Sequence, residues 1–250
     1  MSIITIKTPE EQNLMREGGK ILSACLDHVT KLIKPGISTL EIDRAAEAFI
    51  RSFPGATPAF KGYKGFPGTL CMSINEEVVH GIPSDKKILR DGDIVGVDSG
   101  VLFGGLYTDA ARTAAVGKCS SQSLRLIEAT ERALSECLSA VKPGNRIGDI
   151  SAIIEKVLRS YGFSPVVRCT GHGVGRRLHE PPDILNAGIA GTGPLIKPGM
   201  TLAIEPISSM GSGRIKTAKD GWTVITEERL PSAHFEVTVL VTEKGFEVIT

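Results

Sequence analysis

Apolar residues recur at the spacing of an α-helix in the amino-terminal part of the chain. The first helix is predicted to follow Thr8, because a threonine with Glu11 three residues later is typical of a capping box. Lys34-Pro35-Gly36 is expected to end this helix, since proline and glycine both disfavour its continuation. Ser38 and Glu41 form a second capping box, so a second helix is expected directly after this link.

The same pattern returns 108 residues further along the chain. Apolar positions predict a third helix over residues 124–141 and a fourth over residues 150–158, with Lys142-Pro143-Gly144 between them. The second and fourth helices match without a gap, as Ile42 matches Ile150. The pattern therefore predicts an internal duplication, although two weakly similar segments of this kind can also arise by chance.

A second match follows the helices. LRDGDIVGVD aligns with IKPGMTLAIE, and this alignment sets Asp98 against Glu205. Past each of them the chain reaches another acidic residue on a strand-like run, Asp109 in the first half and Glu236 in the second. Repeats that pack about a pseudo-two-fold axis place matching residues at a shared centre, and the matching residues here are carboxylates.

These patterns predict an α+β fold in which helices cover antiparallel sheet. We expect one domain over residues 1–250, with pseudo-repeats at approximately residues 10–117 and 118–250. The two halves would be related by pseudo-two-fold symmetry.

Asp98 and Asp109 are expected to face each other. Strands are predicted over residues 94–101 and 106–116, and a hairpin between them would set residue 98 directly across from residue 109. Opposed residues share a face of the sheet, with Cβ atoms roughly 4.5–5.5 Å apart. Two facing carboxylates repel unless a cation lies between them or one binds a proton. Arg112 could neutralise the pair, but strand alternation directs it away, so a metal is favoured.

Three of the five histidines lie among residues that constrain the backbone: His80 in VVHGIP, and His172 and His179 in GHGVGRRLHE. The glycines on both sides of His172 remove side-chain bulk and allow a close backbone approach. His28 lies within the first predicted helix and is expected to be structural. His234 alternates with Glu236 and could flank a site, but a structural role is the favoured interpretation there.

Composition narrows the classes of function. The 250 residues are 41% hydrophobic and 23% charged, which is globular composition, and the net charge of +1 gives no electrostatic footprint for nucleic acid or an anionic membrane. The five cysteines form no C-x-x-C pair, which argues against a disulfide framework and fits a reducing compartment. We find no signal-peptide pattern and no apolar run near the roughly 18 residues of a membrane helix, so a cytoplasmic protein is expected.

The candidate ligands are four carboxylates and one histidine: Asp98, Asp109, His172, Glu205 and Glu236. This oxygen-rich set suits a pair of divalent first-row metals rather than a redox centre or a structural zinc. Two such ions roughly 3.5–4 Å apart can hold a bridging water and polarise a carbonyl group. The chemistry that we expect is metal-assisted hydrolysis.

The residues resemble type I methionine aminopeptidases, which have the pita-bread fold. The motifs SINEEVVHGIP, DGDIVGVDSG, GHGVGRRLHEPPDILN, KPGMTLAIEP, KDGWTVIT and SAHFEVTVLVTEKG stand in the order of that family, from about residue 8 to the end. The resemblance implies a metal-dependent exopeptidase that removes the N-terminal methionine when the second residue is small. Its substrates would be peptides and nascent chains, and family analogy adds the ribosome as a partner, with no nucleic-acid specificity and no membrane.

The resemblance also implies roles for the ligands. Asp109 and Glu236 would bridge two divalent ions, which could be Co, Mn, Fe or Zn. Asp98 would chelate one ion, while His172 and Glu205 would complete the other.

Further roles follow from the same resemblance. Glu205 would carry a proton to the departing amine, His179 would contact the substrate carbonyl, and His80 would lie near the scissile nitrogen. The predicted substrate-binding residues are Tyr63, Phe66, Cys71, His80, Leu178, His179 and Trp222.

The sequence departs from the family at a few positions. The segment around Asp109 is similar to that of X-Pro dipeptidases and aminopeptidases P, Val237 stands where histidine is usual, and Leu178 stands where an aromatic residue is frequent. An X-Pro-cleaving enzyme is therefore the nearest alternative, although such enzymes usually carry a long amino-terminal domain for which this chain has no room. A non-catalytic pita-bread protein that binds RNA or protein would be expected to have lost ligands.

Overall fold

The computed structural model describes residues 4–250, and four α-helices and fifteen strands lie in that part of the chain. The helices are α1 (Pro9–Thr30), α2 (Thr39–Arg51), α3 (Ser121–Cys137) and α4 (Ile147–Ser160). Short 3₁₀ turns cover Tyr63–Gly65 and Leu138–Ala140. No helix among these residues has an apolar stretch long enough to cross a bilayer.

Both predicted capping boxes are present. The hydroxyl of Thr8 accepts the backbone N–H of Glu11, and the Glu11 carboxylate accepts the N–H of Thr8 at 2.8 Å. Ser38 and Glu41 make the same exchange at the start of α2. The third helix ends earlier than the predicted residue 141, and its last turn tightens into the 3₁₀ turn. The proline that follows disfavours the α conformation in the residue before it, which shortens the helix.

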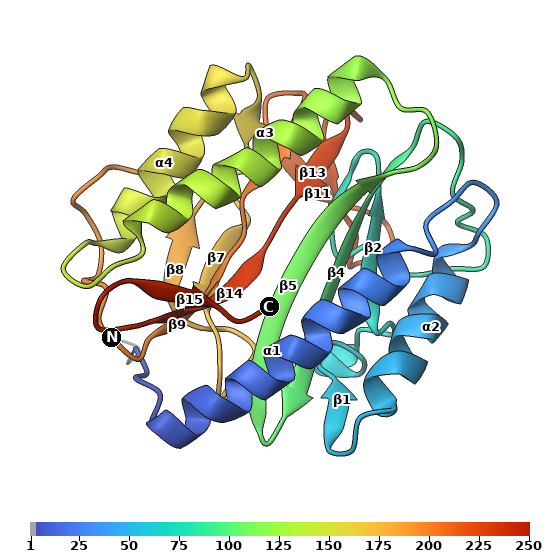
Figure 1. Ribbon diagram of the computed structural model, residues 1–250. Helices are drawn as coiled ribbons and strands as arrows, with labels where there is room; N and C mark the ends of the chain where they lie inside the picture. Colours follow the sequence, from blue (N-terminus) through green and yellow to red (C-terminus); the bar gives the residue numbers. More distant parts are fainter. Residues whose placement is uncertain (1–3) are drawn as a thin grey trace.

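Two larger sheets form the body of the molecule. The first contains β1 (Ala56–Pro58), β2 (Leu70–Ile74), β4 (Ile94–Phe103) and β5 (Leu106–Ala115). The second runs in the order β15 (Phe246–Val248), β14 (Val237–Val241), β9 (Thr201–Ile204), β7 (Thr170–Gly173) and β8 (Glu180–Leu185). In Figure 1, α1 and α2 lie over the first sheet, and α3 and α4 lie side by side in the other half of the molecule, where α4 packs against β8 of the second sheet.

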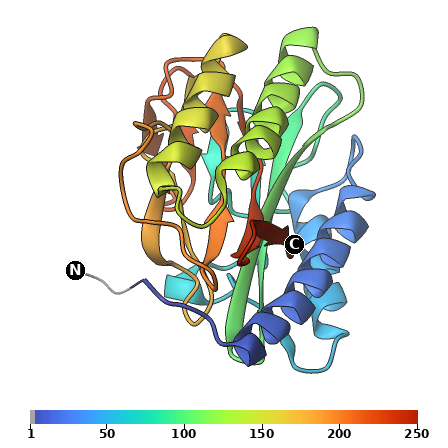
Figure 2. The ribbon, with the colours of Figure 1, turned by 60° about the vertical axis from the view of Figure 1, so that its left-hand side comes forward.

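Two small three-stranded sheets complete the fold. One contains β6 (Ser164–Pro165), β10 (Ile207–Ser209) and β13 (Ser232–His234), and the other contains β3 (Glu77–Val79), β11 (Ile215–Thr217) and β12 (Val224–Thr226). Figure 2 shows that the two helix pairs stay separate when the molecule is turned, with α1 against α2 and α3 against α4. Every pair of neighbouring strands in these four sheets is antiparallel.

The register predicted for the central hairpin is wrong by two residues, because the turn is centred one residue further along the chain than expected. Asp98 lies opposite Ala111, and Asp109 lies opposite Gly100. The cause is the turn: Gly104 and Gly105 have φ values of 57° and 80°, so they form the two-residue connection that needs positive φ at both positions. The two carboxylates are therefore diagonal neighbours. They still share a face, because a shift of two residues preserves strand alternation.

Two large apolar cores flank the line where the sheets meet. One is packed beneath α1 and α2 and includes Ile42 and Ile50, and the other is packed beneath α3 and α4 and includes Ile150 and Leu158. All four side chains are fully buried. Residues that the sequence pairs across the two halves therefore occupy buried faces of α2 and α4, while the duplication itself stays a prediction. The first core includes Ala110 of β5 and the second includes Val239 of β14, so each core holds one of the two strands that meet beside the site.

Candidate metal centre

Among the described residues, one isolated β-bridge joins the two larger sheets. Ala111 of β5 and Glu236, which directly precedes β14, exchange both backbone hydrogen bonds, at 3.2 and 2.9 Å. The hydroxyl of Thr238 extends this junction, because it accepts the N–H of Asp109 at 3.0 Å and donates to its carbonyl at 2.7 Å. Asp109 and Glu236 thus approach each other although they are far apart in the sequence.

Strand alternation decides which side chains share the junction in the first sheet. Asp98 on β4 and Glu236, just before β14, lie opposite Ala111 on its two sides. Opposed residues point to the same face, and Asp109 lies two residues before Ala111 on that face. Three carboxylates therefore point to one side of the sheet.

The second sheet adds its ligands by the same rule. Ala203 of β9 lies opposite His172 of β7 and opposite Thr238 of β14. Glu205 follows Ala203 by two residues, and Glu236 precedes Thr238 by two residues, so their side chains reach the same side. All five predicted ligands consequently face one volume.

The distances bear this out. The Nε2 atom of His172 is 3.9 Å from Oδ2 of Asp109 and 3.7 Å from Oε1 of Glu205. Asp109, His172 and Glu236 each offer one ligand atom, and these atoms lie within 4.8 Å of one another. All three residues are buried. A cation placed among them would contact several ligands at once.

The cluster is chemically incomplete without a cation. Oδ1 of Asp98, Oδ1 of Asp109 and Oε1 of Glu236 are buried, and none of them has a hydrogen-bond partner among the described residues. A buried carboxylate without a partner is expensive in free energy, and such groups are normally hydrogen-bonded or bound to a metal. The donor set, four carboxylates and an imidazole, fits divalent metal ions.

The electrostatics agree with that fit. The pKa of Asp98 is raised to about 7, mainly by burial; His234 opposes this shift, and the neighbouring Glu205 adds to it. Burial and the neighbouring carboxylates also hold the pKa of Asp109 and the pKa of Glu236 well above their usual values. These shifts arise because like charges share a site of low dielectric. Protons or cations must offset the negative charge.

His172 is oriented for metal binding by its neighbour. Its Nδ1 atom lies 2.9 Å from the carbonyl oxygen of Gly173. A carbonyl can only accept, so Nδ1 carries the proton and Nε2 presents a lone pair to the cluster. The glycine-flanked sequence around His172 thus places an imidazole with a defined tautomer.

His234 is the residue that the sequence interpretation underrated. It is buried, its Nε2 lies 3.4 Å from Oε2 of Glu205, and it is 3.8 Å from Oε2 of Glu236. Burial opposes its charged form, but Glu205 and Asp98 outweigh burial and raise the pKa of His234. Its alternation with Glu236 along the chain is the sequence feature that could have placed it at the site. His28, by contrast, stacks on Phe49 at 5.0 Å, away from the cluster.

Arg112 does not neutralise the carboxylates. It forms an ion pair with Asp27 of α1, on the other face of β5. The expectation from strand alternation is confirmed.

The cluster lies in the wall of a cavity of about 490 Å³, a size typical of small-molecule sites. The cavity is lined by all twelve residues of the predicted site: Tyr63, Phe66, Cys71, His80, Asp98, Asp109, His172, Leu178, His179, Glu205, Trp222 and Glu236. Part of its wall is apolar. There Phe66 and Trp222 pack edge to face at 5.2 Å, close to Cys71 and Leu178.

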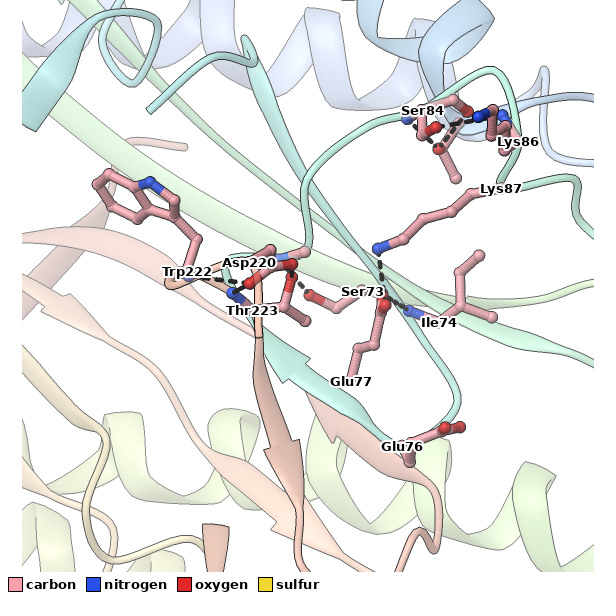
Figure 3. A network of polar contacts seen from close by, with 12 residues as sticks. Ser73, Ile74, Glu76, Glu77, Ser84, Lys86, Lys87, Asp220, Trp222 and Thr223 are labelled. Atoms are coloured by element: carbon pink, nitrogen blue, oxygen red, sulfur yellow. Dashed lines mark hydrogen bonds and ion pairs between the residues drawn. The ribbon is translucent and has the colours of Figure 1, made fainter. Parts of the chain in front are cut away.

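Trp222 is held by a residue that the sequence interpretation did not single out. The carboxylate of Asp220 accepts the backbone N–H groups of Trp222 and Thr223, both at 2.9 Å, and the Thr223 hydroxyl at 2.6 Å. Figure 3 shows this arrangement beside Glu77, which accepts from Lys87 at 2.6 Å and from the Ile74 N–H at 3.0 Å. Short-range hydrogen bonds therefore fix the loop that carries the indole.

His179 lies between the cluster and the apolar wall. Its ring is 4.4 Å from the ring of His172, and its Nδ1 is 3.3 Å from the Tyr63 hydroxyl. The ring reaches solvent at the cavity mouth, yet desolvation by the surrounding protein and the nearby His172 lower the pKa of His179 to about 4. The imidazole is consequently neutral near pH 7.

Comparison with known proteins gives matches along nearly the whole chain. The description "Metallopeptidase family M24" matches residues 13–243. Methionine aminopeptidase 1 of Bacillus subtilis (strain 168) is 46% identical over 248 residues, which is 99% of each chain. The solved structure of methionine aminopeptidase from Thermotoga maritima has a TM-score of 0.97 and 43% identity, and the match covers 99% of both chains.

A more distant match concerns the fold alone. The prolidase from Pyrococcus horikoshii OT3 has a TM-score of 0.79 and 23% identity, and the match covers 98% of this chain and 63% of that one. Together these structures confirm the expected fold class, the α+β pita-bread fold.

The raised pKa values generate a prediction for the metal-free protein. Its free energy of unfolding should fall as the pH rises from about 4 to about 7, because Asp98 loses its proton near pH 4 in the unfolded chain but keeps it to about pH 7 in the folded protein, where its pKa is raised. Urea denaturation in the presence of a chelator would measure this slope. Asp98→Asn should flatten it, and saturating divalent metal should remove it. If wild type and Asp98→Asn showed the same dependence of unfolding free energy on pH, the raised pKa of Asp98 would not be its cause.

Proposed function

The chain belongs to metallopeptidase family M24, and from that premise we propose that it is a methionyl aminopeptidase, which removes the N-terminal methionine of peptides and nascent chains when the second residue is small. One observation carries the proposal: five potential metal ligands line the same cavity as an apolar pocket. Hydrolytic chemistry and side-chain selection can therefore act on one terminal residue. Nascent chains as substrates would place the protein in the cytoplasm, with the ribosome as a partner by family analogy.

The proposed metal site holds two divalent ions of the Mn, Fe, Co or Zn type. Asp109 and Glu236 would contribute a ligand to both ions, Asp98 to one of them, and His172 and Glu205 to the other. The support is the buried carboxylate oxygens that have no partner among the described residues, together with the lone pair on His172. Bound divalent ions supply a water of lowered pKa and polarise the scissile carbonyl.

The chain's own residues perform the proton transfers. Glu205 accepts a proton from the attacking water and delivers it to the nitrogen of the departing amine. This role suits a carboxylate that is only 11% exposed and faces His234 and His172 on its two oxygens. His80 lines the cavity and is placed near the scissile nitrogen in this scheme.

His179 stabilises the developing oxyanion. If the Tyr63 hydroxyl donates to Nδ1, the neutral imidazole carries its proton on Nε2 and can donate it to the substrate carbonyl oxygen. A positioned donor gains strength as charge develops on that oxygen. Because the pKa of His179 is lowered to about 4, the imidazole stays neutral across the neutral pH range, and the hydrogen bond from Tyr63 then sets its tautomer.

The pocket selects the side chain. Phe66, Cys71, Leu178 and Trp222 form a wall without charge, which suits an unbranched thioether. Burying a charged side chain against this wall would cost several kcal/mol, at order-of-magnitude level. The carboxylates beside the pocket leave room for the free ammonium group of the substrate, which restricts cleavage to the terminal residue.

The metal stoichiometry tests the ligand assignment. Wild-type protein loaded with Mn²⁺ should bind about two ions, and Asp109→Ala should lose two-ion binding and nearly all hydrolysis because both ions depend on that carboxylate. Elemental analysis after gel filtration measures the content. Asp27→Ala, which removes a surface carboxylate paired with Arg112, is the matched control and should behave as wild type. Full activity in protein shown to be free of metal would disprove the dinuclear site.

The role of His179 has a separate test. Loss of one oxyanion donor commonly lowers the rate by about 10²–10³, so His179→Ala should reduce kcat by that factor. Its metal content should stay normal, because the proposed role involves no metal contact. His28→Ala is the control. A His179→Ala protein that had lost its ions would show that this residue is a ligand instead.

Substrate choice separates the proposal from its nearest alternative. Rapid release of methionine is expected from Met-Ala and Met-Gly peptides, little from Met-Lys, and essentially none from Ala-Pro or acetylated Met-Ala peptides. Chromatography of the products measures each rate under the same metal loading. An X-Pro-cleaving enzyme would show the opposite order for Ala-Pro, so faster cleavage of Ala-Pro than of Met-Ala would overturn the proposal. A non-catalytic protein would cleave neither.

A further inference from the structure

The loop that carries His179 has little regular structure of its own. It leaves β7 at Gly173, covers residues 174–179 and enters β8 at Glu180. Two residues of the proposed substrate site, Leu178 and His179, lie on this short connection. Its conformation must therefore be set by contacts with the rest of the chain.

One such contact is a buried ion pair with the amino-terminal segment. Nζ of Lys7 lies 2.7 Å from Oε2 of Glu180, and each side chain is only 1% exposed. The other carboxylate oxygen of Glu180 accepts the backbone N–H of Arg177 at 2.9 Å, within the loop itself. The Thr5 hydroxyl donates to Glu180 and accepts from Lys7. Glu180 thereby links the loop to the segment before α1.

Lys7 is itself held in place by its backbone. Its N–H donates to the carbonyl of Gly199 at 2.8 Å, and its carbonyl accepts the side-chain amide of Gln12 at 2.9 Å. The pair thus ties the loop to the start of β9 and to the first turn of α1. Such an anchor does not move independently of the sheets.

The aliphatic part of Lys7 also packs against the loop. A Cβ atom at Gly175 would lie 2.1 Å from Cε of Lys7, so only glycine allows this approach. On its other side, the carbonyl of Gly175 accepts the N–H of Tyr107 from β5 at 2.7 Å. Gly175 is therefore enclosed between Lys7 and the strand that carries Asp109.

A buried ion pair is weak evidence for stability, because desolvation of the two charges offsets most of their attraction. Neither Lys7 nor Glu180 lines the cavity, so neither contacts a substrate. The pair instead makes charged hydrogen bonds, which constrain the geometry of the groups they join. Two apolar side chains in the same place would not impose such a constraint.

We propose that Lys7 and Glu180 are positioning residues, which hold the loop so that the imidazole of His179 stays aligned with the substrate carbonyl. The inference rests on the proposed function, in which His179 donates to that carbonyl. A displacement of about 1 Å in such a donor can lower a rate by up to about 10²-fold. The pair therefore acts on turnover through His179, although it lies outside the cavity.

The test is a double-mutant cycle on the metal-loaded enzyme. Lys7→Met alone leaves Glu180 as an unpaired buried charge and risks unfolding, so the main variant is Lys7→Met/Glu180→Gln, which removes both charges together. Its kcat for a Met-Ala peptide should fall at least about tenfold, with unchanged metal content and a circular dichroism spectrum like that of wild type. In the His179→Ala background the same pair of changes should alter kcat less than about twofold, because the aligned group is already absent.

Arg16→Gln removes another ion pair of the amino-terminal region, between Arg16 and Glu247 at 2.8 Å, and should leave kcat unchanged. An equal fall in kcat in both backgrounds, or no fall in the wild-type background, would overturn the positioning role. If the unmodified enzyme released no methionine, the proposed function would fail instead, and the two failures are thus distinguished.

Discussion

Like charges held together at a sheet junction are the constraint on which the rest of this structure depends. Asp98, Asp109, Glu205 and Glu236 converge on one cavity wall, and three of their oxygens are buried without a partner among the described residues. Such an arrangement opposes folding unless cations or protons offset it. The two apolar cores on either side provide the burial that keeps the strands in place. The site therefore lowers the stability of the metal-free protein, and the same carboxylates favour the binding of metal ions.

Backbone geometry makes that convergence possible. Each larger sheet could exist alone, but the paired hydrogen bonds between Ala111 and Glu236 align their alternation so that one face carries ligands from both. A slip of one residue in either sheet would turn its carboxylates away from the junction. The glycines of the hairpin turn and the hydroxyl of Thr238 hold the register at this point. Ligand geometry is thus a property of the sheet register more than of any single side chain.

Around this rigid centre the substrate-facing residues lie on connections. Trp222 follows an aspartate that binds its backbone, and His179 precedes a glutamate that is paired with Lys7. In both cases a charged side chain outside the cavity wall fixes a loop that contributes to the wall. Loops supported by such contacts keep a defined geometry, whereas the connection alone would sample many conformations. The pattern explains how a site built partly from loops can present an ordered surface.

The sequence alone determined the features that depend on neighbouring residues or on residue type. The order of the acidic motifs indicated a resemblance to type I methionine aminopeptidases, which agrees with the match to family M24. The capping boxes of α1 and α2, the break between α3 and α4, and the pair of strands around Gly104 all follow from local preferences. These signals survive in sequence because each requires contacts only a few residues apart.

Only the tertiary structure decided the hairpin register, the place of His234 beside Glu205, and the pairing of Lys7 with Glu180. The register depends on where the turn is centred. Two adjacent glycine-containing positions could form the turn, and strand alternation by itself does not distinguish them. The other two contacts join residues that are far apart in the sequence. The alternation of His234 with Glu236 indicated a place near the site, but it did not give the contact with Glu205, and nothing in the sequence indicated the pair of Lys7 and Glu180. Burial then set the charge of each group, because the pKa of Asp98 rises through desolvation and neighbouring charge, which exist only in the folded protein.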